Sequence, residues 1–94
     1  MEVKVSIIIP VYGVELFLER AVDSALGQTL AEKEIILVDD GSPDESGALC
    51  DAWAAKDDRV TVIHQDDLGV SGARNSGLAA ADSEFIVFLD SDDA

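Results

Sequence analysis

The sequence predicts an α/β fold in which a parallel sheet carries helices on both faces, with elements in the order β-α-β-α-β-α-β. Two observations lead to this fold class. Four short apolar runs lack helical periodicity, which is typical of strands buried on both faces of a parallel sheet. The three segments between them are long enough for right-handed, helical crossovers. With 94 residues, the chain is one small domain or a piece of a larger one.

The first two strands and the helix between them have the clearest patterns. Residues 3–11 (VKVSIIIPV) form an apolar, β-branched run that predicts a strand. Residues 14–26 place apolar side chains at helical spacing and charged ones on the other face, which predicts an amphipathic helix that ends near Gly27. Residues 34–38 (EIILV) predict the second strand, which stops at two aspartates.

The second helix has three start signals close together. Ser42 suits the N-cap, Pro43 suits the first helical position, and a glutamate follows three residues after the cap. We expect this helix to continue to about residue 56 and to bury Leu49 and Trp53.

The last part of the chain predicts one more helix between two strands. Residues 60–63 (VTVI) predict the third strand, and a polar loop over residues 64–71 follows it. A helix is expected from residue 71 or 72 to about residue 81, weakened by Gly77. Residues 85–89 (FIVFL) predict the fourth strand, which leads directly into an acidic segment, DSDD.

Composition and charge exclude several classes of partner. The chain has 20 acidic and 6 basic residues and a net charge of -14, so it cannot provide the clustered cations that nucleic acids or anionic membranes require. Cys50 is the only cysteine, which rules out an internal disulfide and favours a reducing compartment. The chain has no apolar run as long as a membrane span and no signal peptide at its start. We therefore expect a cytoplasmic protein without a nucleic-acid partner.

The residues that follow the predicted strands should meet at one edge of the sheet. In an open parallel sheet, ligands bind beyond the carboxyl ends of the strands, where the strand order reverses. Aspartates that follow three of the strands are expected there, together with one aromatic ring. The residues at the four strand ends are Pro10, Val11 and Tyr12; Asp39 and Asp40; residues 64–67; and residues 90–93.

The acidic segment after the fourth strand is the best candidate for a metal site. Carboxylates that lie close together repel one another unless a cation or hydrogen-bond donors compensate their charge. Mg²⁺ or Mn²⁺ commonly takes one or two protein carboxylates together with phosphate oxygens. Asp90, Asp92 and Asp93 are therefore predicted metal ligands. The alternative is that these residues only end the strand and form a turn, although turn chemistry does not require three acids.

Asp39 and Asp40 allow two interpretations. Asp40 and Gly41 form a common turn dipeptide. An acid at the end of the second strand can also hydrogen-bond a nucleoside, as in dinucleotide-binding folds. The phosphate-binding fingerprint of those folds needs three glycines, and the corresponding segment PVYGVE has one, which disfavours an NAD site.

Four other residues allow a structural or a functional role. The Tyr12 ring could stack on a base or could be structural, and Arg74 could pair with an acid at this edge or with a phosphate. We assign structural roles to His64 and Cys50, because neither has a partner at a recognisable ligand or nucleophile spacing.

Four motifs occur in an order and at spacings that resemble the start of family 2 glycosyltransferases: SIIIPVYG, IILVDDGSPDES, GVSGARNSGL and FIVFLDSDD. The resemblance implies an inverting enzyme with a GT-A fold, whose Rossmann-like N-terminal half has the strand order 3-2-1-4. It implies that the chain binds a nucleotide-sugar donor, with UDP as the expected nucleotide. Residues 1–94 would then be a single truncated nucleotide-binding subdomain.

The resemblance also implies roles for individual residues. Tyr12 corresponds to the residue that packs on the base, with Pro10 and Val11 shaping the pocket, and Asp40 to the carboxylate that recognises uracil, with Asp39 beside it. A second group of residues corresponds to contacts with the ribose, the diphosphate and the metal. Arg74 and Asn75 match an Ala-Arg-Asn element near the nucleotide, Asp90, Ser91 and Asp92 match the DXD motif that contacts ribose and holds the metal, and Asp93 is a further candidate ligand.

The chain departs from the family pattern in three places. Gly13 and Asp67 stand where asparagine is common, and the sequence ends four residues after Asp90. In this family the acceptor site and the catalytic base lie in the second half, so we expect no catalytic residue in this chain and little transferase activity from it alone. The full-length enzyme would transfer a sugar to a saccharide or lipid-linked acceptor with inversion, either in the cytoplasm or peripheral to the inner membrane face.

The sequence also allows two other classes of function. FIVFLDSDD also resembles the strand and DxD motif of phosphohydrolases with an aspartate nucleophile, but there the motif opens the fold, whereas here it closes the chain. A non-catalytic module that binds a nucleotide or cation, or that serves in assembly, remains an alternative. The order 3-2-1-4 also leaves the fourth strand at an edge, which predicts self-association through that strand.

Overall fold

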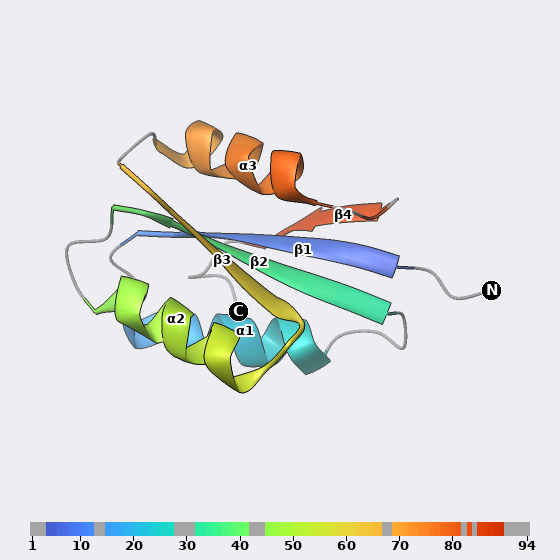
Figure 1. Ribbon diagram of the computed structural model, residues 1–94, viewed down its shortest axis with the longest axis horizontal. Coiled ribbons are helices and arrows are strands. Elements are labelled where there is room, and N and C mark those ends of the chain that lie inside the picture. The colour runs from blue at the N-terminus through green and yellow to red at the C-terminus, as the bar shows by residue number, and fades with distance from the viewer. Residues whose placement is uncertain are drawn as a thin grey trace.

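The computed structural model describes residues 4–12, 15–27, 32–41, 45–66, 69–81, 83 and 85–89. Within them, strands and helices alternate along the chain, as the sequence predicts (Figure 1). The elements are β1 (Lys4–Val11), α1 (Glu15–Gly27), β2 (Glu32–Asp40), α2 (Ser46–Lys56), β3 (Val60–Gln65), α3 (Gly69–Ala80) and β4 (Phe85–Phe88).

The four strands form one parallel sheet in the order β3-β2-β1-β4, which confirms the predicted fold class and strand order. Helix α3 covers one face of the sheet, and α1 and α2 cover the other (Figure 1). The main-chain N–H of Leu89, just after β4, donates to the carbonyl oxygen of Ile8 over 3.0 Å. The carboxyl end of β4 therefore lies beside β1, at the position where the strand order reverses.

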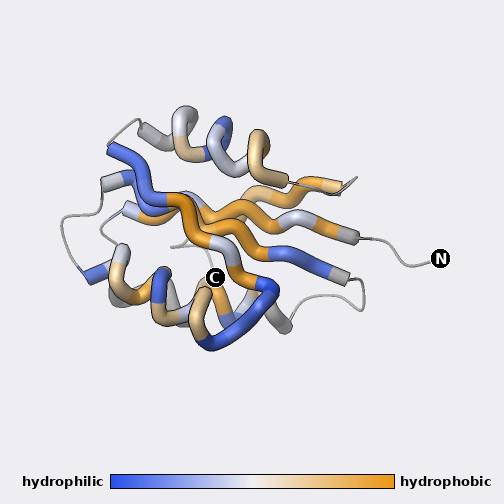
Figure 2. The backbone as a smooth tube through the Cα atoms, viewed as in Figure 1, coloured by the Kyte–Doolittle hydropathy of each residue, from blue (hydrophilic) through white to orange (hydrophobic). Residues whose placement is uncertain are grey.

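Both faces of the sheet are packed against helices, which explains why the strand sequences are apolar without alternation. Alternate residues of β1 and β2 enter different cores. On the face covered by α1 and α2, the core includes Ile7, Ile9, Val11, Ile35 and Leu37 with Val22, Ala25, Cys50 and Trp53. On the α3 face it includes Ile8, Ile36, Val38 and Ala73. Figure 2 shows the apolar centre of the sheet between the two helical layers.

Gly77 lets α3 approach the sheet closely. A Cβ atom at this position would lie 3.2 Å from both Cγ1 and Cδ1 of Ile8, and still closer to its Cγ2. Ile8 is fully buried in the middle of β1. The glycine that weakens the predicted helix therefore has a packing function, because a side chain would push α3 away from β1.

Two strands extend further than their apolar runs predict. β2 continues through Asp39 and Asp40, and β3 continues through His64 and Gln65, because these polar residues pair in register, Asp39 with His64 and Asp40 with Gln65. The prediction of a loop beginning at residue 64 is therefore wrong by two residues.

The predicted helix boundaries also need correction. Helix α2 begins at Ser46, and the expected cap residues Ser42 and Pro43 lie outside the described residues. Leu49 was expected in the core but is 37% exposed, whereas Ser46, Cys50 and Trp53 form the buried face of α2. Helix α3 begins at Gly69, two residues before the earliest predicted start.

Candidate functional site

The carboxyl ends of β1, β2 and β3 and the start of α3 lie at one edge of the sheet, at the left of Figure 1. This edge holds the ends of β1, β2 and β3 in adjacent register, with Val11 paired to Asp39 and Asp40 paired to Gln65. The first residue of α3, Gly69, has a φ of 80°, in the left-handed region that favours glycine. The edge is the position where ligands bind in open parallel sheets.

Asp40 lies on the α3 side of the sheet and is only 3% exposed. One carboxylate oxygen, Oδ1, accepts a hydrogen bond from Gln65 Nε2, and the other, Oδ2, accepts one from the main-chain N–H of Gly69, each over 2.9 Å. The hydroxyl of Ser76 in α3 donates in turn to Gln65 Oε1. Asp40 therefore connects the end of β2 to β3 and to the first turn of α3.

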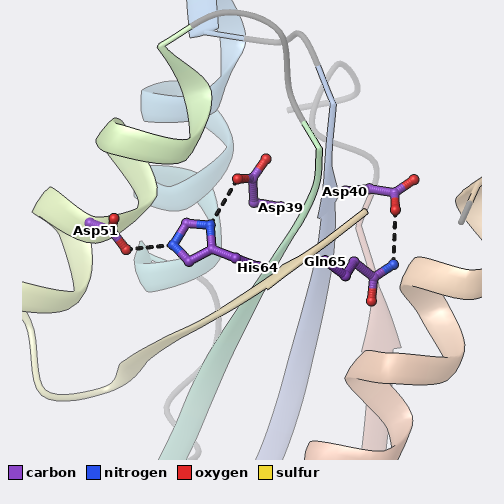
Figure 3. Close-up of polar contacts among 5 residues, drawn as sticks. All are labelled: Asp39, Asp40, Asp51, His64 and Gln65. Carbon is purple, nitrogen blue, oxygen red and sulfur yellow. Dashed lines mark hydrogen bonds and ion pairs between the residues drawn. The ribbon is translucent and has the colours of Figure 1, made fainter. Parts of the chain in front are cut away.

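Asp39 lies on the opposite face of the sheet and is 8% exposed. Its Oδ2 is 2.8 Å from His64 Nδ1, and the other ring nitrogen of His64, Nε2, is 2.8 Å from Asp51 Oδ1 in α2 (Figure 3). A Cβ at Gly47 of α2 would lie 2.7 Å from Asp39 Oδ2, so glycine at this position makes room for the carboxylate.

His64 bridges the two carboxylates best as an imidazolium, because both ring nitrogens then donate. Its hydrogen bonds to Asp51 and to Asp39 raise its pKa above the ordinary value. Cys50 lies in the same layer, and burial, followed by the negative charges of Asp39 and Asp51, raises its pKa to about 12. The thiol is therefore protonated and unreactive, consistent with the predicted structural role.

The residues predicted at the end of β1 differ in what they expose. Tyr12 directly follows the strand and is 53% exposed, so its ring is accessible at the edge. Pro10 is partly buried. The side chain of Val11 is fully buried in the core shared with α1 and α2.

One of the two predicted residues of α3, Arg74, lies close to the end of β4. Arg74 is partly buried, and its guanidinium carbon lies 5.6 Å from the centre of the Phe88 ring, the last residue of β4. Asn75 is exposed. The acidic segment Asp90, Ser91, Asp92 and Asp93 lies outside the described residues. In the part of the chain that is described, no group of three or more His, Cys, Asp or Glu side chains could hold a metal ion.

Sequence reasoning missed the partners of the two aspartates. Gln65 was not singled out, and His64 was assigned a structural role for lack of a partner. The available signal was parallel pairing, because the two polar residues after VTVI must lie beside the two aspartates after IILV if both strands end at the same edge. The bonds from Asp51 and Ser76 come from helices, and strand patterns give no information about them.

Comparison with known proteins identifies the family. The profile described as Glycosyl transferase family 2 matches residues 6–94. The chain belongs to glycosyl transferase family 2. Similar family members include EpsJ, an uncharacterized glycosyltransferase of Bacillus subtilis, with 53% identity over 89 residues. The glycosyltransferase GlyG of Streptococcus pneumoniae is 44% identical over 90 residues. The alignments cover 95% of this chain in both cases, but only 26% of EpsJ and 30% of GlyG.

Solved glycosyltransferase structures have the same fold. The crystal structure of residues 1–349 of TarS from S. aureus matches 95% of this chain and 27% of its own, with a TM-score of 0.82 and 30% identity, and TarS has also been solved with UDP and with UDP-GlcNAc. The mannosyltransferase PcManGT from Pyrobaculum calidifontis, in complex with GDP-Man and Mn²⁺, matches 98% of this chain and 28% of its own, with a TM-score of 0.88 and 25% identity. The sheet of this chain is thus the Rossmann-like N-terminal half of a GT-A fold.

The family resemblance seen in the four motifs is therefore confirmed over nearly the whole chain. The similar solved structures include complexes with UDP-GlcNAc and with GDP-Man and Mn²⁺. Among the described residues, no helix is long and apolar enough to cross a membrane.

Proposed function

We propose that residues 1–94 are the nucleotide-binding part of a longer glycosyltransferase and that they bind the nucleoside diphosphate of a sugar donor together with a divalent metal. The observation that carries this proposal is that Asp40, at the end of β2, accepts a hydrogen bond from the first N–H of α3 at the carboxyl edge of the sheet, where Tyr12 follows the neighbouring β1. UDP is the preferred nucleotide, because the motif resemblance implies a uracil-recognising carboxylate at Asp40. The GDP-Man complex of PcManGT makes GDP the natural comparison.

The base would be recognised at the end of β1 and β2. The carboxylate of Asp40 can accept a hydrogen bond from the N3–H of uracil, and the exposed ring of Tyr12 can stack on the base. Pro10 and Val11 would border this pocket. Asp39 remains a predicted nucleotide contact beside Asp40, although its carboxylate faces α2.

The diphosphate and ribose would lie nearer to β4. Arg74 and Asn75 are proposed contacts on α3, and the position of the Arg74 guanidinium against Phe88 supports a place near the acidic segment that follows β4. Asp90 and Ser91 would contact the nucleotide. The proposed ligands of Mg²⁺ or Mn²⁺ are Asp92, Asp90 and Asp93, whose carboxylates suit a hard cation.

The complete enzyme would transfer the sugar to a hydroxyl of a saccharide or lipid-linked acceptor with inversion at the anomeric carbon. A metal at this edge would act as a Lewis acid for the departing diphosphate. The residues of this chain would bind and orient the nucleotide, whereas the general base is expected in the remainder of the enzyme. This division of labour makes the chain inactive by itself, and its expected location is the cytoplasm or the inner membrane face.

Calorimetric titration of the chain with UDP, with and without Mn²⁺, tests the proposal. We expect binding that depends on Mn²⁺ and that weakens by about tenfold or more in Asp92→Ala, because a carboxylate ligand of the cation is lost. Asp58→Ala is the matched control, since it removes one exposed acid in the turn before β3. Absence of binding of both UDP and GDP to the folded chain would refute the proposal in favour of a non-catalytic module.

A further inference from the structure

The last two residues of β3 hold the last two residues of β2, one on each face of the sheet. Figure 3 shows Gln65 directed toward Asp40 and His64 directed toward Asp39. Asp40 is on the side of α3, where the nucleotide is proposed to bind, and Asp39 is on the side of α2. Gln65 therefore contacts the aspartate that is proposed to recognise the base, and His64 contacts its neighbour.

The carboxylate of Asp40 is held in one orientation by donors from two different elements. Gln65 Nε2 of β3 bonds one oxygen, and the main-chain N–H of Gly69 at the start of α3 bonds the other. Rotation of the carboxylate about its own axis would break both bonds in a site that is 97% shielded from water, where such bonds are costly to lose. The two donors thus fix the plane of the Asp40 carboxylate.

The Gln65 amide directs its NH₂ group at Asp40 and its oxygen at Ser76, which anchors it. The Ser76 hydroxyl donates to Gln65 Oε1, and this leaves the NH₂ group directed at the carboxylate. The reversed amide would direct its oxygen at the negatively charged carboxylate, which is unfavourable. A continuous series of bonds therefore runs from the middle of α3 through Gln65 to Asp40.

We propose that Gln65, oriented by Ser76, is the positioning residue that aims the Asp40 carboxylate at the hydrogen-bond donor of the nucleobase. This inference rests on the proposed function and specifies how its base-recognition site is organised. In it Gln65 acts only through Asp40 and does not touch the nucleotide. Uracil presents its N3–H to such an acceptor and guanine its N1–H, so correct aim of the carboxylate contributes to binding of the base and not of the diphosphate.

Two substitutions of Gln65 distinguish the effect of its hydrogen bond to Asp40 from the effect of its side-chain size. Gln65→Leu removes both the donor and the acceptor of the amide. Gln65→Glu keeps the size but places a carboxylate opposite Asp40, where like charges repel. In both variants we expect the Kd for UDP in the presence of Mn²⁺ to rise by about tenfold, whereas the Kd for pyrophosphate with Mn²⁺ changes by less than about twofold.

Ser76→Ala provides an independent test of the same series of bonds. It should weaken UDP binding less than Gln65→Leu, because Asp40 keeps its donor and only the orientation of the amide is released. In the Gln65→Leu background, Ser76→Ala should have no further effect, since its action passes through Gln65. Asp51→Asn is the matched control: it weakens a bond to the other β3 residue, His64, on the opposite face, and should leave UDP affinity unchanged.

The measurements are isothermal titration calorimetry and circular dichroism with thermal unfolding on each variant. Selective loss of UDP affinity with pyrophosphate affinity retained supports the positioning role. Equal loss for UDP and pyrophosphate would assign Gln65 a general structural role and overturn the inference, as would unchanged UDP binding in folded Gln65→Glu. If the unsubstituted chain binds neither UDP nor GDP, the proposed function fails and this inference fails with it; if the unsubstituted chain binds UDP and only the variant result is negative, the proposed function stands.

Discussion

Substitution of Gly77 by alanine tests how closely α3 packs on the sheet. The added Cβ would lie 3.2 Å from Cγ1 and Cδ1 of Ile8 and closer to its Cγ2, distances that real side chains avoid. Ile8 is fully buried between the sheet and α3, so its side chain cannot turn toward solvent. The extra methyl group must displace either the helix or Ile8.

Two opposing terms determine the change in stability. Overpacking of a buried contact costs about 1–3 kcal/mol, whereas replacing glycine by alanine inside a helix gains about 1 kcal/mol. The net expectation is that Gly77→Ala lowers the free energy of unfolding by about 1 kcal/mol, which for a domain of this size lowers Tm by about 4–8 °C. The packing cost exceeds the helix gain because the contact involves three atoms of one rigid, β-branched side chain.

Urea and thermal unfolding followed by circular dichroism measure this difference. Gly27→Ala, in the last turn of α1, is the control, because a Cβ there would meet nothing within 4 Å and should be neutral or slightly stabilising. A Gly77→Ala protein as stable as the unsubstituted chain, or more stable, would show that α3 does not approach β1 as closely as described.

Two further predictions concern the charge of His64 and the edge of β4. Hydrogen bonds to Asp51 and Asp39 raise the pKa of His64 in the folded chain. The positive charge of His64 therefore stabilises the fold fully below the unfolded pKa of about 6.5. This stabilisation is lost as the pH rises through the raised folded pKa. The loss of stability in His64→Asn should therefore be larger near pH 6 than near pH 9, and an equal loss at both would contradict an imidazolium between two carboxylates. Among the described strands β4 pairs with β1 alone and exposes Phe85, Val87 and Phe88, so sedimentation should detect association that rises with concentration and falls in Val87→Lys. A strictly monomeric chain at high concentration would exclude that edge as an interface.

The fold could be read from the sequence because both faces of this sheet are buried. Runs such as SIIIPV and EIILV are apolar almost throughout, as strands buried on both faces are. Each is followed by a segment long enough for a crossover. The strand order came from the resemblance of four motifs to a family, since apolar pattern alone does not say which strand lies at the centre. Only the pairing of β1 with both β2 and β4 decided it physically.

Element ends were predicted less well than element types. Hydrophobicity stops at Val38 and Ile63, but hydrogen bonding between parallel neighbours continues for two more residues in each strand. In α2, Leu49 looked like a core residue, yet the orientation of the helix on the sheet buries Cys50 and Trp53 instead. Both errors arise because local pattern carries no information about where a neighbouring element lies.

The sequence by itself determined which side chains follow the first two strands at this edge: a tyrosine after the first and paired aspartates after the second. Strand ends of a parallel sheet must share one edge, so residue order was sufficient for that. Only the tertiary structure decided that Asp39 and Asp40 serve opposite faces and that Gln65 and Ser76 hold Asp40. The physical reason is that side chains of neighbouring strand residues point in opposite directions, and their partners come from whichever helix packs on that face.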